Sequence, residues 1–289
     1  MSQASRIPVA STMEGVDPLH DPDDEALLDP RQARDLAGLV ETAQLASGAI
    51  RYGRIGRIGA ANAVLNPENP LTSANHACGL WGTLAEVATT LLRLEQSFAD
   101  AGRSEAVVYA SPSTVVEIEG IADDAGWRAV QENMAQLHRS RTTVTVSTEP
   151  ALDGDLRGIA ELIADDAGLS GSGEQRLARS LGHRVDDPRC VLRVLRDAEA
   201  DRLAGFAQGF TERGIGLVEH VVVRPGRRRR GAGSSLATEV VDELYARGAR
   251  LIAGHGEEGG AAERFSEACG FEPAYPVTAY ARRVDELLD

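Results

Sequence analysis

Residues 218–236, with the sequence VEHVVVRPGRRRRGAGSSL, decide how the second half of this chain folds. A run of β-branched residues predicts a strand, and a loop of arginines and glycines leads from it into a predicted helix. The first turn of a helix carries unpaired N–H groups and the positive end of the helix dipole. Glycines let such a backbone approach an anion closely. The stretch therefore predicts a main-chain phosphate site, with positive charge added by Arg228, Arg229 and Arg230.

The segments on either side of this stretch predict alternating helices and strands. Apolar residues at helical spacing predict two helices before it, and the run TTVTV predicts a strand before those helices. The predicted elements of this half are strands at 142–146, 190–196, 202–210, 216–223, 250–254 and 277–281, and helices at 155–166, 173–185, 234–247 and 260–269.

The first half shows a similar but weaker pattern. Its predicted elements are helices at 31–47, 84–101 and 113–125, and strands at 106–110 and around Met134 and Leu137. The glycines of RYGRIGRIGA (51–60) lack the spacing of a dinucleotide-binding loop, so we interpret this run as a strand with bends.

An internal repeat links the two halves. Laying Gly126-Trp127 over Gly270-Phe271 places 106–110 over 250–254 without a gap. This match predicts a duplicated unit, so that both halves share one fold. The polar residues 138–141 mark the expected boundary. We therefore predict a disordered acidic tail at 1–30, a first domain at 31–140 and a second at 141–289.

Composition excludes several function classes. The 289 residues carry a formal net charge of −14, and all 30 basic residues are arginines. Because the chain has no lysine, it cannot form a Schiff base with a substrate or cofactor, and it cannot supply the lysine of a nucleotide phosphate loop. The acidic balance argues against nucleic-acid binding and slightly favours a cationic substrate.

Location and metal content are also constrained. The three cysteines form no CxxC pair, no apolar run reaches the roughly 18 residues of a membrane helix, and no signal peptide is recognisable. The six histidines show no HExxH or paired spacing. We expect a cytoplasmic protein with no membrane segment and no metal.

The glycine motif carries a family resemblance. Arg228-x-x-Gly231-x-Gly233 resembles the R/Q-x-x-G-x-G/A signature of the GNAT superfamily of acyl-CoA N-acyltransferases, and Cys269-Gly270-Phe271 resembles its terminal helix-Gly-Phe motif. The resemblance covers about half the chain. It implies an α/β (α+β) protein with two tandem GNAT-like folds, each a mixed central sheet flanked by helices.

The first half lacks the phosphate motif. Where the duplication places it, residues 79–90 read GLWGTLAEVATT, with neither the glycine pair nor an arginine. The resemblance thus implies a degenerate first domain that shapes the acceptor pocket or replaces a dimer partner, in a monomer or a homodimer.

The family implies cofactor contacts by position. Backbone groups of Val221, Val222 and Val223 would hold the pantetheine arm like an added strand, with the Val221 N–H polarising the thioester carbonyl. The pyrophosphate would lie on N–H groups of the loop and the helix start, namely Arg228, Arg229, Arg230, Gly231, Ala232, Gly233 and Ser234.

Glu219 is the expected base, because it lies on the strand that the acyl group approaches. The alternative is a salt-bridged strand carboxylate. Strand alternation predicts His220 on the opposite face, as a packed core histidine. The tyrosine that serves the family as general acid is replaced by Ser266, so Ser266, Tyr280 or a water would substitute, or the thiolate would leave unassisted.

These observations predict an N-acetyltransferase that moves an acetyl group from acetyl-CoA to a primary amine, with a small molecule as the expected acceptor. One alternative is a regulatory protein that binds acyl-CoA with little catalysis, since the usual acid is missing. Another is a nucleotide-binding protein that uses the glycine loop.

Overall fold

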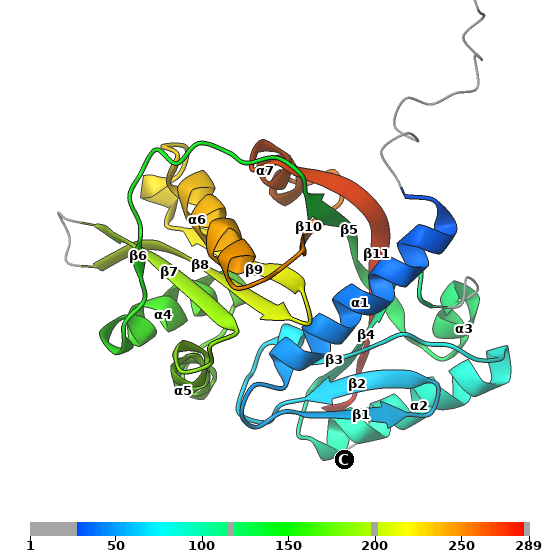
Figure 1. The fold of residues 1–289 in the computed structure, drawn as a ribbon. Helices are drawn as coiled ribbons and strands as arrows, with labels where there is room; N and C mark the ends of the chain where they lie inside the picture. The colour runs from blue at the N-terminus through cyan, green and yellow to red at the C-terminus, as the bar shows by residue number, and fades with distance from the viewer. Residues whose placement is uncertain (1–27, 115–117, 198–201, 286–289) are drawn as a thin grey trace, which may run out of the picture.

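The computed structural model describes residues 28–114, 118–197 and 202–285, and its strands form one mixed sheet (Figure 1). The strand order across the sheet is β1-β2-β3-β4-β11-β5-β10-β9-β8-β7-β6. The strands span β1 Arg54–Ile58, β2 Ala61–Leu65, β3 Asn75–Cys78, β4 Glu105–Ala110, β5 Arg128–His138, β6 Glu149–Pro150, β7 Cys190–Asp197, β8 Arg202–Glu212, β9 Ile215–Val223, β10 Leu251–Glu257 and β11 Phe271–Arg283.

Helices cover both faces of this sheet. The helix that follows Asp29 begins with a proline, and the Asp29 carboxylate accepts hydrogen bonds from the first backbone N–H groups. This helix, α1, packs against β8, β9 and β2 and so crosses the middle of the molecule (Figure 1). The helices span α1 Pro30–Gly48, α2 Leu84–Asp100, α3 Ile118–Asp124, α4 Leu156–Ala167, α5 Ser172–Val185, α6 Ala232–Ala246 and α7 Ala261–Ala268.

The two predicted halves exchange strands. β5 comes from the first half, yet it lies between β10 and β11 and pairs antiparallel with both. β11 comes from the second half, yet it lies between β5 and β4 of the first half. Figure 1 shows β11, in red, running beside β5 and on to β4. The sheet is continuous because each half supplies a strand that the other half needs.

The duplication is visible in the backbone. Gly126 follows α3 and Gly270 follows α7, and both adopt a left-handed conformation, with φ of 76° and 85°. At Gly270 a Cβ atom would lie 1.8 Å from the carbonyl oxygen of Ser140. Only glycine fits such a position, so the Gly-Phe motif is explained by a tight turn from helix to strand.

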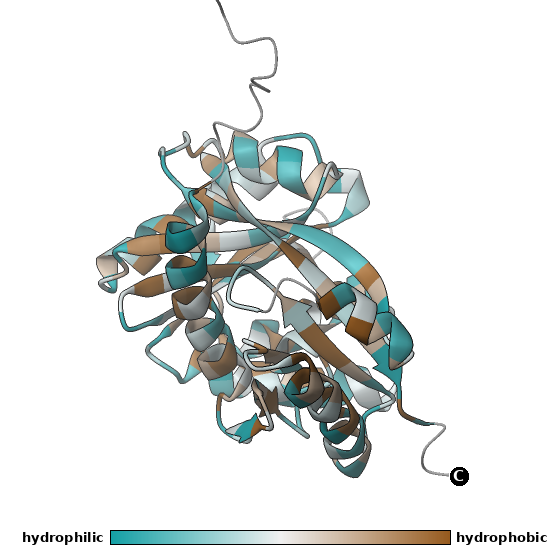
Figure 2. Cartoon of the chain, turned by 90° about the vertical axis from the view of Figure 1, so that its right-hand side faces the viewer, coloured by the Kyte–Doolittle hydropathy of each residue, from teal (hydrophilic) through white to brown (hydrophobic). Residues whose placement is uncertain are grey.

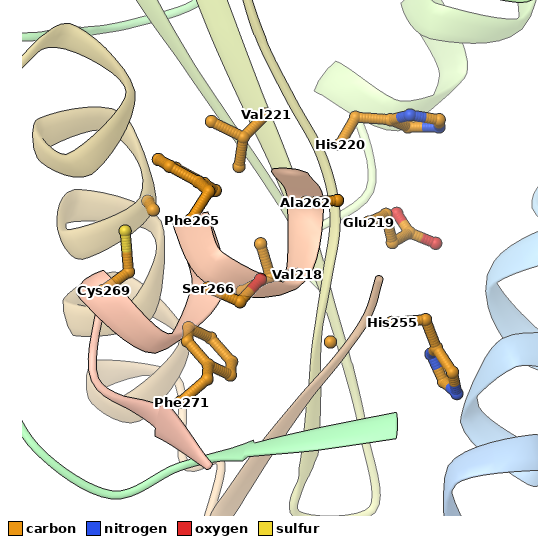
Figure 3. Close-up of a pocket in the computed structure, with 12 residues that line it drawn as sticks. Val218, Glu219, His220, Val221, His255, Ala262, Phe265, Ser266, Cys269 and Phe271 are labelled. Carbon is orange, nitrogen blue, oxygen red and sulfur yellow. The ribbon is translucent and has the colours of Figure 1, made fainter. Parts of the chain in front are cut away.

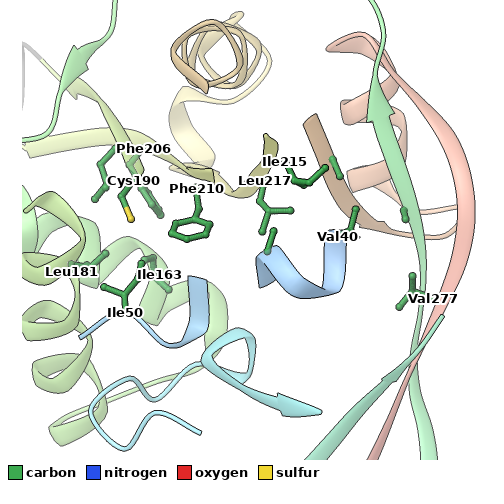
Figure 4. Close-up of a cluster of buried hydrophobic side chains, with 14 of the residues drawn as sticks. Val40, Ile50, Ile163, Leu181, Cys190, Phe206, Phe210, Ile215, Leu217 and Val277 are labelled. Carbon is green, nitrogen blue, oxygen red and sulfur yellow. The ribbon is translucent and has the colours of Figure 1, made fainter. Parts of the chain in front are cut away.

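Apolar side chains form a core on each face of the sheet. One core lies between the sheet and α1, α4 and α5, and Figure 4 shows Phe206, Phe210 and Leu217 at its centre. A second surrounds Trp127 under α2 and α3, and a third lies under α6. The helices in Figure 2 carry both teal and brown residues along their length, as amphipathic helices do.

Most predicted elements form, but the strand predicted at 142–146 is wrong. This segment is extended without strand partners and runs across the N-terminal end of α6. The hydroxyl oxygen of Ser235 accepts hydrogen bonds from the backbone N–H groups of Thr145 and Val146, each at 3.0 Å. A helix side chain therefore satisfies the backbone groups that a neighbouring strand would have satisfied.

The predicted tail and the predicted absence of a membrane segment can be compared only with the residues that the structure describes. The predicted tail at 1–30 lies outside them except for 28–30, and residue 30 already belongs to α1. Among the helices that the structure does describe, none is long and apolar enough to cross a membrane.

Candidate active site

The parallel strands β9 and β10 separate halfway along their length. They pair from Ile215 with Leu251 to Val218 with Gly254, and no further. Beyond this point β9 stays bonded to β8, while β10 stays bonded to β5. The side of β9 that faces the split therefore has no strand partner from residue 219 to residue 223.

A β-bulge lies at the mouth of the split and corrects one prediction. Gln208 pairs with His220 and Gly209 pairs with Val218, so Glu219 is the extra residue of β9. A bulge interrupts strand alternation. Glu219 and His220 consequently point to the same side of β9, opposite to Val221 (Figure 3). His220 lies beside Phe206, as the core-histidine interpretation expected.

The Glu219 carboxylate is fully engaged by its neighbours. Its Oε2 accepts hydrogen bonds from Arg184 Nη1 at 2.8 Å and Gln208 Nε2 at 2.7 Å, and its Oε1 accepts one from the Ser47 hydroxyl. Burial would raise the pKa of Glu219, but the Arg184 charge and these hydrogen bonds hold it below its ordinary value. The carboxylate is thus ionised and paired, as in the salt-bridge alternative.

The glycine and arginine loop leads into α6 as predicted. Gly231 precedes the helix with φ of 78°, and a Cβ there would lie 2.3 Å from Thr145 Oγ1. No side chain caps α6, so its first N–H groups stay open to a ligand. Arg228 donates from Nε to the Val223 carbonyl, whereas Arg229 and Arg230 are exposed.

The matching helix of the first half differs in this respect. The N-terminus of α2 carries a capping box, in which Thr83 and Glu86 each accept a hydrogen bond from the other's backbone N–H. The carboxylate of Glu86 occupies the position that an anion would need. This supports the prediction that the first half has no phosphate site.

Two cavities meet at the split, one on each face of the sheet. The α7-side cavity, of about 120 Å³, is lined by β9, β10, α6 and α7 and contains Val221, Phe265 and Ser266 (Figure 3). The α1-side cavity, of about 130 Å³, is lined by both halves of the chain. The residues that line both cavities are Val218, Glu219 and His255.

The α1-side cavity contains residues that the sequence analysis missed. The first half supplies Gln44, Ser73, His76, Tyr109 and Asn133 to its lining. A signal for part of this set was present, because polar residues at 41, 44 and 47 recur every three positions on a helix that is otherwise apolar on its buried side. The histidines had no signal, since their spacing in the sequence matches no motif.

His76 is buried and His255 is half-buried, and both cavity histidines are uncharged at neutral pH. Burial lowers the pKa of His76 to about 4, although the backbone at Thr72 and Ser73 partly opposes this, and burial lowers the pKa of His255 to about 4 as well. An unfolded chain returns both groups to a pKa near 6.5. Between pH 6.5 and pH 4 the unfolded state therefore binds protons that the folded state does not.

We expect this difference to make the protein sensitive to acid. Stability is complete above pH 6.5 and is lost as the pH falls towards 4, by roughly 3 kcal/mol for each histidine, since one pKa unit corresponds to about 1.4 kcal/mol. Urea unfolding at pH 7 and pH 4.5 should show a smaller loss for His76→Gln and for His255→Gln than for the unchanged chain. Equal losses in all three proteins would contradict the prediction.

The predicted substitutes for the missing acid lie in different places. Ser266 lines the α7-side cavity, near Val218 and Val221 (Figure 3). Tyr280 lies on β11 in the core around Trp127, and it lines neither cavity. The structure therefore does not bring Tyr280 to the site. Among the described residues, no group of three or more possible ligands could hold a metal ion.

Comparison with known proteins agrees with this geometry. The profile of the Acetyltransferase (GNAT) family matches residues 157–271, from α4 to the start of β11. This match supports acyl transfer from acyl-CoA as the general class of reaction. No curated protein matches the sequence.

Solved structures resemble nearly the whole chain. A GCN5-related N-acetyltransferase from Kribbella flavida has a TM-score of 0.62 at 17% identity, over 85% of this chain and 95% of that one. A GCN5-related N-acetyltransferase from Sphaerobacter thermophilus has a TM-score of 0.54 at 17% identity, over 89% and 94%. A tandem GNAT protein from the clavulanic acid biosynthesis pathway has a TM-score of 0.57 at 16% identity, over 91% and 96%. The chain thus has a tandem GNAT fold, and its residues 157–271 match the Acetyltransferase (GNAT) family.

Proposed function

We propose that the chain transfers an acetyl group from acetyl-CoA to a primary amine of a small molecule. The observation that carries the proposal is the split between β9 and β10, where an unpaired strand edge joins a cavity on each face of the sheet. One cavity would receive the thioester and the other the amine. The two reactants would meet beside Glu219 and His255.

The unpaired edge of β9 suits a pantetheine arm. Its amide groups can bond to the backbone of Val221, Val222 and Val223 as an added strand does. An N–H group beside the bulge would polarise the thioester carbonyl. The Ser266 hydroxyl faces the same cavity and can donate a hydrogen bond to the departing thiolate.

The other end of the coenzyme suits the start of α6. Open N–H groups of residues 232–234, the glycine at 231 and the exposed arginines 229 and 230 together favour a pyrophosphate. Glycine also matters at 233, where a Cβ would lie 3.0 Å from Phe265 Cε2. The atom nearest to such a Cβ is the ring edge of Phe265, a side chain that can shift by a few tenths of an ångström.

Gly233→Asp is expected to weaken acetyl-CoA binding at least tenfold, which corresponds to about 1.4 kcal/mol. The new carboxylate would repel the pyrophosphate. The helix itself should remain folded, because an acidic residue in the first turn interacts favourably with the helix dipole. Calorimetric titration with acetyl-CoA measures the affinity of both proteins.

Gly154→Asp is the matched control. It adds the same charge at a position that lines neither cavity and where a Cβ would meet no atom within 4 Å. This variant should bind acetyl-CoA like the unchanged chain. Equal affinity of both variants would show that the start of α6 does not hold the coenzyme, and no binding by the unchanged chain would remove the proposal.

A second function, acyl-CoA binding for regulation, is favoured by two features. The tyrosine that would act as general acid is absent, and Glu219 is held in an ion pair. A protein that binds acyl-CoA for regulation needs the cavity and the loop but no proton acceptor. The two functions differ in turnover, since only an enzyme would release coenzyme A and an amide together. Acetyl-CoA binding without transfer to any amine would favour the regulatory function.

A further inference from the structure

The α1-side cavity is built by both halves and is mainly uncharged. Its one carboxylate, Glu219, is balanced by Arg184, whose side chain is 6% exposed. The remaining polar lining consists of amides, hydroxyls and two neutral histidines. An isolated charge placed here would be buried without a partner, which is strongly unfavourable. The cavity therefore suits a short polar group that carries no second charge.

His255 occupies the junction between this cavity and the thioester side. It lies on β10 just past the point where β9 separates, and it lines both cavities. Figure 3 shows its ring on the same side of the split as Glu219, facing α1 in blue. Its Nδ1 lies 3.4 Å from the amide nitrogen, Nε2, of Gln44 on that helix. A flip of the Gln44 amide lets the amide oxygen accept from Nδ1–H, and in that arrangement His255 Nε2 keeps a free lone pair.

His76 faces the same cavity from β3. Its side chain is 1% exposed and lies edge-on to Tyr109. The backbone at Thr72 and Ser73 lies close enough to affect its pKa, but neither ring nitrogen makes a hydrogen bond of good geometry among the described residues. Buried polar atoms in folded proteins are nearly always bonded, so this imidazole has hydrogen-bonding capacity to offer a ligand in the cavity.

We propose that His255 takes the proton from the acceptor amine, that Glu219 serves as a fixed ion-pair partner rather than as the base, and that His76 hydrogen-bonds the acceptor. This inference rests on the proposed function and names the residues that would complete it. The acceptor is a small primary amine with a hydroxyl or amide, and with no second charge, near the nitrogen.

The reaction balances without any further reagent. The amine nitrogen attacks the thioester carbonyl carbon, a C–N bond forms, and the C–S bond breaks. The neutral amine becomes a cationic nitrogen in the adduct, which is more acidic than a free ammonium group, and its extra proton passes to His255 Nε2. The thiolate of coenzyme A then takes up a proton, and His255 returns its own to solvent. The products are the amide and free coenzyme A.

The test uses the full chain with acetyl-CoA and three probes of similar size: ethanolamine, glycine and putrescine. Ethanolamine should react with a kcat/KM at least tenfold above the other two, because glycine adds a carboxylate and putrescine a second ammonium group. His255→Ala should lower kcat for ethanolamine by about 100-fold or more. Its affinity for acetyl-CoA, measured by calorimetry, should stay within threefold, which shows that the fold is retained.

Added imidazole distinguishes a base from a structural residue. The space left in His255→Ala can admit imidazole, which should restore the rate at least tenfold, whereas a structural role would not be rescued. His76→Asn should raise KM for ethanolamine about tenfold with kcat nearly unchanged. His183→Gln is the control, because it alters a histidine on α5 that lines neither cavity. His255→Gln serves as the base-deficient variant if the alanine variant does not fold.

The outcomes separate the two proposals. No acetyl-CoA binding by the unchanged chain overturns the proposed function itself. Binding without transfer to any probe, or glycine or putrescine reacting as well as ethanolamine, overturns the acceptor class. Retained kcat in the His255 variants, or a lost rate that imidazole does not restore, overturns the base assignment while the proposed function stands.

Discussion

Expressed alone, residues 141–289 are expected not to fold, although they include the whole segment that matches the GNAT family. Both neighbours of β11, which are β4 and β5, come from the first half. β10 would also lose β5 and leave a long unpaired edge, which promotes aggregation. Soluble yield and circular dichroism of the isolated segment measure this effect.

Co-expression of residues 1–140 and 141–289 as two chains supplies the control. Since each chain carries a strand that the other needs, the pair should associate and recover the coenzyme affinity of the intact protein. A folded monomer of 141–289 alone would show that the exchanged strand β5 is dispensable. It would also support 140 as a boundary between independent domains, a division that stays a prediction.

Removing Arg184 is expected to destabilise the protein by about 3–5 kcal/mol, because Arg184→Met leaves the Glu219 carboxylate buried without its partner. The two side chains are only 6% and 13% exposed, and their closest atoms lie 2.8 Å apart. The guanidinium also donates to the Ser47 carbonyl and hydroxyl oxygens, and so joins α1 to α5. Urea unfolding at pH 7 gives the loss in the free energy of unfolding.

The double variant Arg184→Met/Glu219→Gln should recover much of this loss, because it removes both charges together. The two single variants and the double variant form a cycle that isolates the interaction of the pair. A loss below about 1 kcal/mol in Arg184→Met would mean that the carboxylate is solvated in solution. Glu219 would then regain its place as the expected base.

Local sequence patterns determined most of the helices and strands. Apolar spacing predicted α2, α4 and α6 to within about two residues at each end, because an amphipathic helix requires its period wherever it packs. The glycine pair and the neighbouring arginines predicted the loop before α6, because few residues other than glycine allow a left-handed backbone or a close approach of the backbone to other atoms. The strand predicted at 142–146 was wrong, because β-branched residues favour a strand only where a neighbouring strand is available to pair with them.

Only part of the candidate site could be recognised from local sequence patterns. The side that suits the coenzyme is continuous in the sequence, from Glu219 to Ser234, and so its residues could be named from a motif. The α1-side cavity is assembled from α1, β3, β4, β5 and β10, which are far apart along the chain. No local pattern marks residues such as Gln44, His76 and His255 as neighbours.

The sequence by itself thus determined most of the elements, the duplication and the glycine and arginine loop before α6, because these depend on backbone conformations and on contacts between residues close in the chain. Only the tertiary structure decided that β5 and β11 each lie among strands of the other half, that Glu219 is paired with Arg184, and that His76 and His255 line one cavity. These features depend on pairings between distant segments, whose free energy is settled when the whole sheet closes.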